Sequence, residues 1–301
     1  MAVEASSLSA RRRRGAIRAG AGGPRYPGWL ALPAVAWYAL FFLAPLSIMA
    51  VFSVATRVGF TEIVYSFDLD NFRYLWDPLY GRVFLRTLGL AFFGTIATLL
   101  VGFPVAYYLA RYARRRTLLL LLIVVPFWTS FLIRTYSWLI ILDRDFPVFR
   151  ALRSIGVLPE DLQILYTSKA VYIGVVYNYL PLMILPLYAA LERMDWSLVE
   201  AAQDLGDSAL RAFRRVTLPL VVPGIAAGSL LVFIPLMGEF LIPVILGGDL
   251  TVYAGNLIGQ QFLTARDWPF GAAIAMVVIA AMTVLVLAYA RLVGGEEQHG
   301  R

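Results

Sequence analysis

Long apolar runs separated by short polar segments make up most of this 301-residue chain. A bilayer core about 30 Å thick requires about 20 apolar residues in a helix, so each run of that length is a candidate span. Six such runs occur, at approximately 29–55, 84–110, 117–142, 169–191, 220–246 and 270–292. Prolines inside several runs are tolerated in membranes, because neighbouring helices and water satisfy the freed carbonyl groups. The pattern predicts an all-α integral membrane protein with six transmembrane helices.

The composition agrees with this fold class. Hydrophobic residues make up 60% of the chain, charged residues only 15%, and the mean hydropathy is +0.74. A formal charge of +7 raises the question of nucleic-acid binding. The arginines, however, gather at the ends of apolar runs, as the cytoplasmic anchors of membrane proteins do. We therefore expect contact with membrane lipid and no nucleic-acid partner.

The distribution of arginine predicts the orientation of the chain. Arginine is more frequent in the segments that lie inside when the N-terminus is cytoplasmic, which favours six spans with both termini in the cytoplasm. Residues 1–28, rich in Arg, Ala, Gly and Ser, are expected to be a disordered cytoplasmic tail. The membrane domain then covers 29–292, and 293–301 form a second cytoplasmic tail. This orientation places a polar segment, the 192–219 loop, in the cytoplasm.

The 192–219 loop has the pattern of two short amphipathic helices. Ser197 and Glu200 have the spacing of a capping box, which predicts that a helix starts there. Gly206 is expected to end this helix with a left-handed backbone conformation. Asp207 or Ser208 could cap a second helix, which we expect Pro219 and Pro223 to end before the fifth span. Apolar residues lie at helical spacing on one face of each helix, and they are Leu198, Ala201, Ala202, Leu205, Leu210, Phe213 and Val216.

Two interpretations of this loop follow from its residues. It could lie flat on the membrane surface, or it could dock in a groove of a soluble partner. Its acids cluster in the first helix and the approach to it, and they are Glu192, Asp195, Glu200, Asp204 and Asp207. Anionic lipid would repel these carboxylates, so their charge favours a protein partner.

The stretch "EAAQDLGDSALRAFRRVTLP" also carries a family resemblance. It resembles the EAA loop of the membrane subunits of binding-protein-dependent ABC importers. Six positions match the pattern at its spacing, and they are Glu200, Ala201, Ala202, Gly206, Leu218 and Pro219. Val216 stands where isoleucine is usual.

Further stretches narrow the resemblance. "PFWTSFLIRTYSWLIIL" at 126–142, "PLMGEFLIPVILGG" at 235–248 and "RDWPFGAAIAM" at 266–276 are similar to segments of spermidine/putrescine importer permeases, in particular the first of their two sister subunits. The resemblance extends from about residue 29 to 292. It implies the type I importer permease fold, in the cytoplasmic (inner) membrane of a bacterium.

The resemblance also implies partners and a role for the loop. The chain would pair with a sister permease as a heterodimer, bind two copies of a cytoplasmic ABC ATPase, and receive substrate from an external binding protein. The loop would couple ATPase closure to alternating access, through Glu200, Ala201, Ala202, Asp204, Gly206 and Pro219. The substrate would be a polyamine. The alternatives are a permease for another small solute, such as an amino-acid derivative or ferric ion, and a stand-alone secondary transporter.

The residues present exclude several kinds of catalytic site. The chain has no cysteine, and its single histidine, His299, lies in the C-terminal tail. Its single lysine, Lys169, is followed by Ala170, so no P-loop of the form Gly-x-x-x-x-Gly-Lys-Ser/Thr exists. We read the acid pair Asp143/Asp145 as solvated charges of an outer loop. No catalytic residue, metal site or cofactor is therefore expected, and ATP hydrolysis must belong to another polypeptide.

Two ionisable residues, Arg134 and Glu239, lie deep in apolar runs, where charges are costly and are functional candidates. At about 1.5 Å per residue, both would lie about 25 to 27 Å from the inner side of the membrane. They could pair with each other or snorkel outward as structural charges. Alternatively, Glu239 could face the substrate pathway and attract a protonated amine, with Trp128, Tyr136 and Trp138 offering ring faces for cation–π contact.

Overall fold

The computed structural model describes residues 28–59, 62–159, 161–248 and 251–294, and it separates into two units at residue 48. The first unit contains η1 Gly28–Ala31, α2 Leu32–Tyr38, η2 Ala39–Leu43 and the first turn of α3 Ala44–Ser53. These elements follow one another as an apolar helical segment from Leu32 to Ser53 whose side chains are largely exposed within the chain. Such a segment is suited to contact lipid or another membrane subunit.

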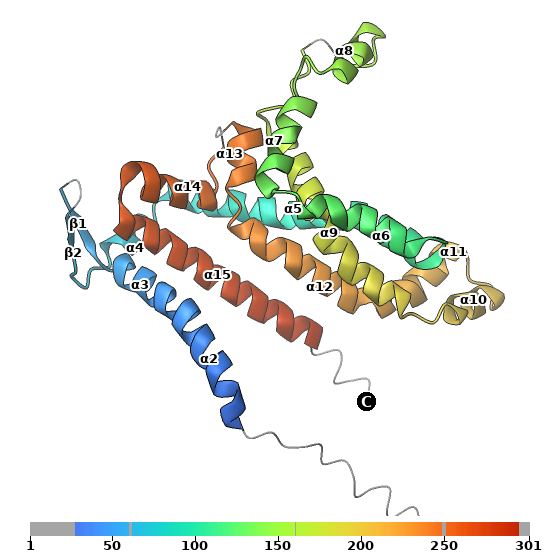
Figure 1. The fold of residues 1–301 in the computed structure, drawn as a ribbon, viewed down its shortest axis with the longest axis horizontal. Coiled ribbons are helices and arrows are strands. Elements are labelled where there is room, and N and C mark those ends of the chain that lie inside the picture. The colour runs from blue at the N-terminus through green and yellow to red at the C-terminus, as the bar shows by residue number, and fades with distance from the viewer. Residues whose placement is uncertain (1–27, 60–61, 160, 249–250, 295–301) are drawn as a thin grey trace, which may run out of the picture. The chain divides into compact units, whose positions relative to one another are not determined.

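Three long helices form the core of the second unit. They are α5 Pro78–Arg111, α9 Ser168–Glu192 and α12 Leu218–Met237, and they pack side by side (Figure 1). A Cβ atom added at Gly224 of α12 would lie 2.4 Å from the Cβ atom of Ala190, and one at Gly228 would lie 3.1 Å from the carbonyl oxygen of Met183. Glycine is therefore required where α12 approaches α9, as small residues are wherever membrane helices pack closely.

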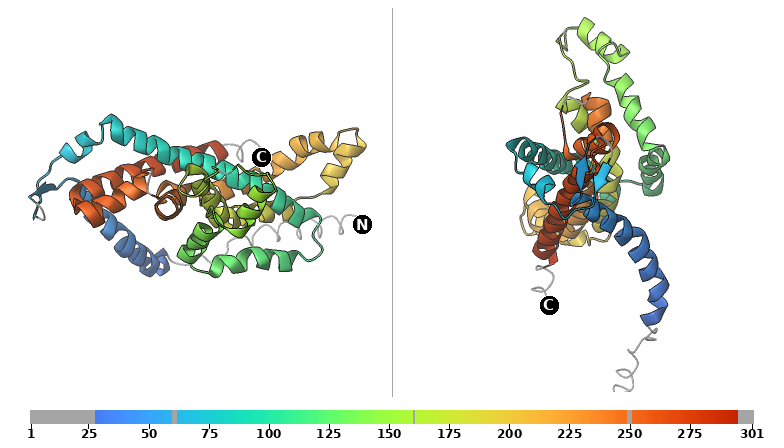
Figure 2. Two further views of the ribbon diagram at one scale, coloured as in Figure 1. Left: turned by 90° about the horizontal axis from the view of Figure 1, so that it is seen from above. Right: turned by 90° about the vertical axis from the view of Figure 1, so that its left-hand side faces the viewer.

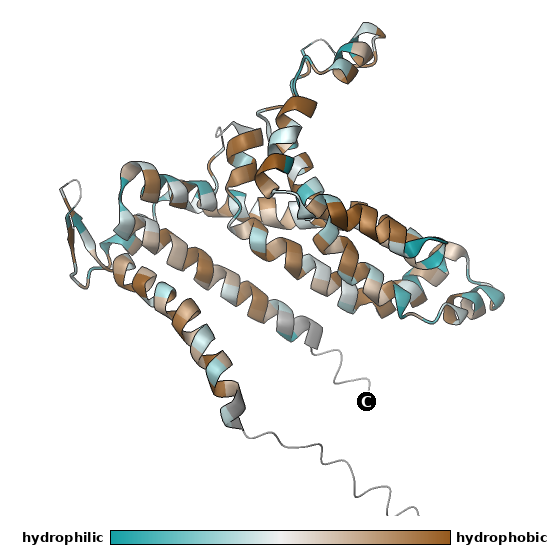
Figure 3. Cartoon of the chain, in the orientation of Figure 1, coloured by the Kyte–Doolittle hydropathy of each residue, from teal (hydrophilic) through white to brown (hydrophobic). Residues whose placement is uncertain are grey.

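Hydropathy follows this arrangement. The residues of α5, α9, α12 and α15 Trp268–Gly294 are predominantly apolar, whereas polar residues are concentrated in the loops at the ends of the helices (Figure 3). By length and composition, five helical segments in the described residues could cross a membrane, or six if one bent pair counts as a single span. The prediction of a helical membrane protein is therefore confirmed, and the number of spans is the predicted six when the bent pair is counted as one.

The third predicted span, 117–142, is the bent one. It consists of α6 Arg116–Val124, η3 Val125–Trp128 and α7 Phe131–Ile141, and the chain turns by 94° between the two halves. Thr129 and Ser130 are extended at the turn, where the Thr129 hydroxyl donates to the carbonyl of Pro126. The depth expected for Arg134 assumes a continuous helical rise through this span, and the bend shows that this count does not give its depth.

The fifth predicted span, 220–246, is also interrupted. After α12 ends at Met237, three residues break the helix before α13 Leu241–Gly247 begins. The start of α14 Ala254–Gln260 presses against this break, since a Cβ atom added at Gly255 would lie 2.7 Å from the Gly238 carbonyl oxygen. η5 Gln261–Ala265 follows α14 and leads into α15, which matches the sixth predicted span.

The remaining elements lie at the ends of the core. The strands β1 Thr56–Val58 and β2 Glu62–Val64 form an antiparallel hairpin in which Arg57 pairs with Ile63, so the fold is not purely helical. Two short helices, α4 Asp70–Tyr74 and α8 Pro147–Ser154, belong to the loops before α5 and after α7. The 192–219 loop contains α10 Ser197–Asp204, α11 Ala209–Ala212 and η4 Phe213–Thr217, and it lies at the end of this unit opposite to the hairpin (Figures 1 and 2).

Candidate functional site

The first helix of the 192–219 loop starts where the sequence predicts, but with a different cap. The backbone amide of Ser197 donates to the Asp195 carboxylate at 3.0 Å, and no side-chain cap comes from Ser197 itself. Trp196 already has helical dihedral angles, so Ser197 lies inside the helix and cannot adopt the extended backbone of a capping residue. The predicted capping box between Ser197 and Glu200 is therefore wrong, and the exposed Glu200 carboxylate is left available to a partner.

The pKa of Asp195 reflects its capping role. Hydrogen bonds from the Ser197 side chain and from the Ser197 backbone amide lower the pKa of this carboxyl group below its usual value. Asp195 is thus held in the ionised form at the positive end of α10, where a negative charge is favourable.

Gly206 ends α10 as the sequence predicts. Its φ of +94° lies in the left-handed region, its amide donates to the Gln203 carbonyl, and the amide of Asp207 donates to the carbonyl of Ala202 at 3.0 Å. These two hydrogen bonds form a Schellman motif, which satisfies carbonyl groups that the helix end would leave unpaired.

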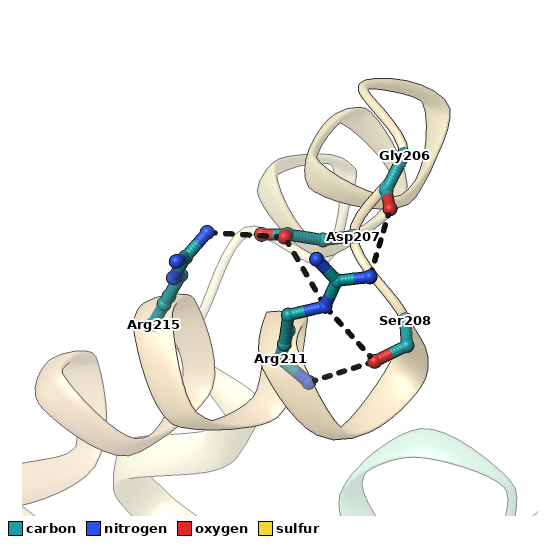
Figure 4. A network of polar contacts seen from close by, with 5 residues as sticks. All are labelled: Gly206, Asp207, Ser208, Arg211 and Arg215. Carbon is teal, nitrogen blue, oxygen red and sulfur yellow. Dashed lines mark hydrogen bonds and ion pairs between the residues drawn. The ribbon is translucent and has the colours of Figure 1, made fainter.

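A polar network then fixes the elbow between the two helices (Figure 4). The Ser208 side chain accepts from the backbone amide of Arg211 and caps α11, as expected for one of the two candidate caps. Asp207, the other candidate, instead forms ion pairs with Arg215 at 3.1 Å and Arg211 at 3.9 Å. The Arg211 guanidinium also donates to the carbonyl of Gly206 at 3.4 Å. The elbow is therefore held from both sides rather than left free.

The second helix of the loop does not end at Pro219. α11, η4 and α12 follow one another without a gap, so the helical path runs from Ala209 to Met237. η4 is a π-helix in which the amide of Leu218 donates to the carbonyl of Phe213, and this wider turn accommodates the proline that follows. The predicted stop was wrong, and the loop is directly continuous with the fifth span.

The loop presents apolar side chains outward. Val199 of α10 is buried in the core, whereas Leu198 is 47%, Leu205 is 90% and Leu210 is 67% exposed. Ala201 and Asp204 are exposed on the same short helix. An exposed apolar surface bordered by carboxylates is suited to bind another protein.

The second candidate site surrounds the break between α12 and α13. Glu239 lies in the break and is only 7% exposed. One carboxylate oxygen accepts from the backbone amides of Leu241 at 2.9 Å and Ile242 at 3.1 Å, and so caps the start of α13. The other accepts from the hydroxyl group of Tyr179 on α9 at 2.5 Å. The carboxylate is thus bound on both oxygens within the chain.

Arg134 on α7 lies near this group without pairing with it. Its guanidinium stacks on the rings of Phe127 at 4.6 Å and Phe131 at 5.8 Å, and Phe131 in turn contacts the Tyr179 ring. In the described part of the chain, Arg134 and Glu239 form no ion pair, and the Arg134 Nε atom has no hydrogen-bond partner. The expectation that these two charges pair with each other is not supported.

Sequence reasoning missed three polar residues of this group. Asn178 on α9 donates to the Thr135 hydroxyl at 3.3 Å and to the Gly174 carbonyl, and both Asn178 and Thr135 are buried. Tyr179 is the partner of Glu239. The signal was present, because a polar Asn178 inside the apolar run 169–191 is costly in a membrane and marks a candidate site.

The three aromatic candidates lie farther out. Trp128 is 79% exposed at the end of η3, and Tyr136 on α7 is 53% exposed. Trp138 is half-buried and packs edge-on against Tyr177 at 5.3 Å. Trp128 and Tyr136 are therefore available to contact a substrate, a second subunit or lipid.

A metal site is not indicated in the residues that the structure describes. Within these ranges, no group of three or more histidine, cysteine, aspartate or glutamate residues could hold a metal ion.

Comparison with known proteins agrees with this architecture. Residues 99–294 match the family of the binding-protein-dependent transport system inner membrane component. The chain is 42% identical over 258 residues to the spermidine/putrescine transport system permease protein PotB of Escherichia coli K12, covering 85% of this chain and 94% of that protein. The corresponding PotB of Haemophilus influenzae is 40% identical over 256 residues, covering 85% and 90%.

A solved structure has the same fold. A bacterial ABC transporter involved in the import of the acidic polysaccharide alginate contains a chain with a TM-score of 0.70 to this one. The match covers 88% of this chain and 95% of that chain at 18% sequence identity. The type I permease fold is thus shown by structure as well as by sequence.

Proposed function

Because the chain belongs to the family of inner membrane components of binding-protein-dependent transport systems, we propose that it is a polyamine permease subunit of an ATP-driven ABC importer. It is a multi-pass protein of the inner membrane. The observation that carries the proposal is the 42% identity to PotB of Escherichia coli, which extends over nearly the whole folded chain. The substrates in that protein's name are spermidine and putrescine.

The 192–219 loop is proposed as the contact with the ATPase. Glu200, Ala201 and Asp204 are exposed on one short helix, and the exposed Leu205 follows it directly. Two copies of a cytoplasmic ATPase would bind this loop and that of a sister permease. Ala202, Gly206 and Pro219 act within the chain. They pack α10, form the elbow and join the loop to the fifth span. ATP hydrolysis is assigned to the partner, since this chain has no P-loop.

The external partner is proposed to be a substrate-binding protein. A bacterial alginate ABC transporter in complex with a pentasaccharide-bound periplasmic protein shares the fold, with a TM-score of 0.63 over 88% of this chain. The end of the second unit with the β1–β2 hairpin lies opposite to the 192–219 loop and would face such a protein.

The substrate pathway is proposed to pass the polar group around Glu239. Its carboxylate would attract a protonated amine, while the exposed rings of Trp128 and Tyr136 would contact the aliphatic stem or the ammonium groups. Arg134 and Trp138 lie one turn apart on α7, where Arg134 stacks on Phe131, the ring that contacts Tyr179, and Trp138 packs on Tyr177. A cation in the pathway would compete with the Tyr179 hydroxyl for the carboxylate.

The test is transport by the complete complex. The chain, a sister permease, the ATPase and the binding protein are reconstituted in proteoliposomes, and uptake of labelled spermidine is measured with and without ATP. We expect ATP-dependent uptake that requires the binding protein. Uptake of a different solute instead, such as ferric ion or an amino-acid derivative, would reassign the substrate. Uptake without any ATPase would overturn the importer function in favour of a secondary transporter.

A Glu239→Gln variant tests the pathway. Glutamine retains an oxygen for the Leu241 and Ile242 amides, so the variant should assemble and hydrolyse ATP normally while uptake of spermidine falls at least about tenfold through loss of the charge. Unchanged uptake would contradict the role of Glu239. Asp161→Asn, the same carboxylate-to-amide change at an exposed position, serves as the control.

A further inference from the structure

The first helix of the 192–219 loop is attached to the end of α5 by ring contacts. Trp196, the residue before α10, packs edge-on against Tyr107 of α5 with ring centroids 5.5 Å apart. The Arg111 guanidinium lies over the Trp196 ring at 4.9 Å and also donates to the Tyr107 hydroxyl at 3.0 Å. The Arg111 side chain therefore makes both contacts at once: it stacks on Trp196 of the loop and donates a hydrogen bond to Tyr107 of α5.

The second helix of the loop is attached to the same end of α5. Phe213, in η4, packs edge-on against Phe103 with centroids 5.6 Å apart and against Tyr107 at 6.3 Å. Phe103 also stacks on Tyr107 at 6.4 Å. Tyr107 thus contacts side chains from both helices of the loop, on either side of the Gly206 elbow.

These contacts continue into the core. Val199 of α10 and Ala212 of α11 are both fully or nearly fully buried, and they belong to the same apolar cluster as Leu109 and Ala110 of α5. The elbow between the two helices is itself fixed by the Asp207 ion pairs. The loop is therefore packed into the core of the unit, and its link to the last turns of α5 is made by the ring and arginine side chains described above.

We propose that five side chains, the aromatic clamp, fasten the 192–219 loop to α5 so that loop and second span move together during transport. The aromatic clamp consists of Phe103, Tyr107, Arg111, Trp196 and Phe213. This inference rests on the proposed importer function and deepens it. The continuous helical backbone from the loop into α12 carries ATPase motion into α12. The clamp carries the same motion into α5, through side chains that touch neither ATPase nor substrate.

The half-buried location of the clamp suits this role. All five side chains are partly accessible, so the ring contacts and the Arg111 contact lie at the boundary between the packed core and the surface. Aromatic pairs and cation–π contacts have preferred distances and angles. A displacement of Trp196 or Phe213 therefore weakens their ring contacts with Tyr107 unless Tyr107 moves with them. The clamp residues are positioning residues, and their loss should uncouple motion rather than remove chemistry.

The main test compares transport with ATP hydrolysis in the reconstituted complex. In a Trp196→Ala variant, we expect spermidine uptake per ATP hydrolysed to fall about tenfold, while ATP hydrolysis itself stays within about twofold of wild type. Trp196→Phe keeps a ring against Tyr107 and should restore most of the ratio. Trp29→Ala, which removes the same side chain at a position of the first unit that is 64% exposed, is the matched control and should leave the ratio unchanged.

The outcomes separate the clamp from the proposed function. Uptake and hydrolysis falling in proportion, or an unchanged ratio in Trp196→Ala, would overturn the clamp while wild-type transport still supports the importer. A wild-type complex without ATP-dependent uptake of any solute would instead overturn the importer function.

A distance measurement tests the clamp even if Trp196→Ala does not assemble. The chain has no natural cysteine, so spin labels can be placed at Leu100→Cys on α5 and Gln203→Cys on α10, both exposed positions. In the complex with otherwise native sequence, the distance between these labels should be the same without nucleotide and with trapped ATP. A shift of the distance distribution between the two states would overturn the proposal.

Discussion

Two helix interruptions in this chain have the same local sequence, a glycine followed by an acid, but opposite surroundings. Gly206–Asp207 lies in the 192–219 loop, where Asp207 pairs with two arginine side chains that are 59% and 67% exposed. Gly238–Glu239 lies in the break of the fifth span, where Glu239 is 7% exposed and accepts from neutral donors, two amides and a hydroxyl group. The comparison shows how the environment selects the partners of a carboxylate.

The difference has a physical cause. At the surface, water and salt screen an ion pair, so the partners of Asp207 can be long, mobile arginines at little cost. In the interior, an unpaired donor or acceptor is expensive, and short, fixed hydrogen bonds from two amides and one hydroxyl group satisfy Glu239. The glycines differ too. Gly206 requires a positive φ, whereas Gly238 has φ −104° and no neighbour that would clash with a side chain.

The largest effect is expected when the buried carboxylate is removed. Glu239→Leu would leave the Tyr179 hydroxyl and the amides of Leu241 and Ile242 without their acceptor, and we expect a loss of about 3 kcal/mol or more in stability. Thermal unfolding of the purified protein in detergent measures this. Glu239→Gln, which keeps an acceptor, should lose much less, and equal losses in both variants would contradict the capping role.

A smaller loss is expected at the left-handed elbow. Gly206→Ala forces a side chain into a positive φ and should destabilise the protein by about 1 to 2 kcal/mol. Gly238→Ala is the matched control, since its backbone conformation is open to any residue, and it should change stability by less than about 0.5 kcal/mol. The same unfolding measurement compares the two variants. A reversed order would show that the break, rather than the elbow, requires glycine.

The surface ion pairs should contribute less still. Asp207→Asn removes the partner of Arg211 and Arg215, and we expect a loss of at most about 1 kcal/mol that shrinks as salt is added. Unfolding in low and high sodium chloride measures the difference. The stability loss in Glu239→Leu should not depend on salt. If the stability loss in Asp207→Asn were also independent of salt, the ion pairs of Asp207 would not be screened surface pairs.

The smallest change concerns the pH dependence of Asp195, a third carboxylate that caps a helix. Its pKa is lowered in the folded protein, so it stabilises the fold above its unfolded pKa, and this contribution is lost as the pH falls through the folded value. Asp195→Asn should therefore be less stable than wild type at pH 7, and the difference should shrink in acid. A difference that grows as the pH falls would contradict the sign of the shift.

Parts of the candidate sites could be predicted because their signals are local. The left-handed conformation of Gly206, the Ser208 cap and the exposed arginines follow from residues within a few positions of one another. The predicted Ser197–Glu200 capping box failed at the same scale, because Asp195, two residues before Ser197, is an equally good acceptor. Local patterns give several candidate caps for this helix. The helical backbone at Trp196 determines which of them can form.

Other parts could not be predicted because their partners are distant in the sequence. The Tyr179 hydroxyl that binds Glu239 is 60 residues away, and the Trp196 and Phe213 rings meet Tyr107 of another span. The pairing of Arg134 with Glu239 was one of the alternatives that two charges at similar depth left open. In the structure, Arg134 follows the 94° bend of the third span and lies over phenylalanine rings instead.

The sequence by itself determined the membrane class, the six apolar runs, the exposed loop and its family pattern, since hydropathy and motif spacing are properties of neighbouring residues. The tertiary structure decided where the third and fifth spans break, which donors satisfy Glu239, and how the loop is fastened to α5. These depend on which side chains meet across helices. In a membrane interior, each polar group must find such a partner, and only the packed fold shows which one it is.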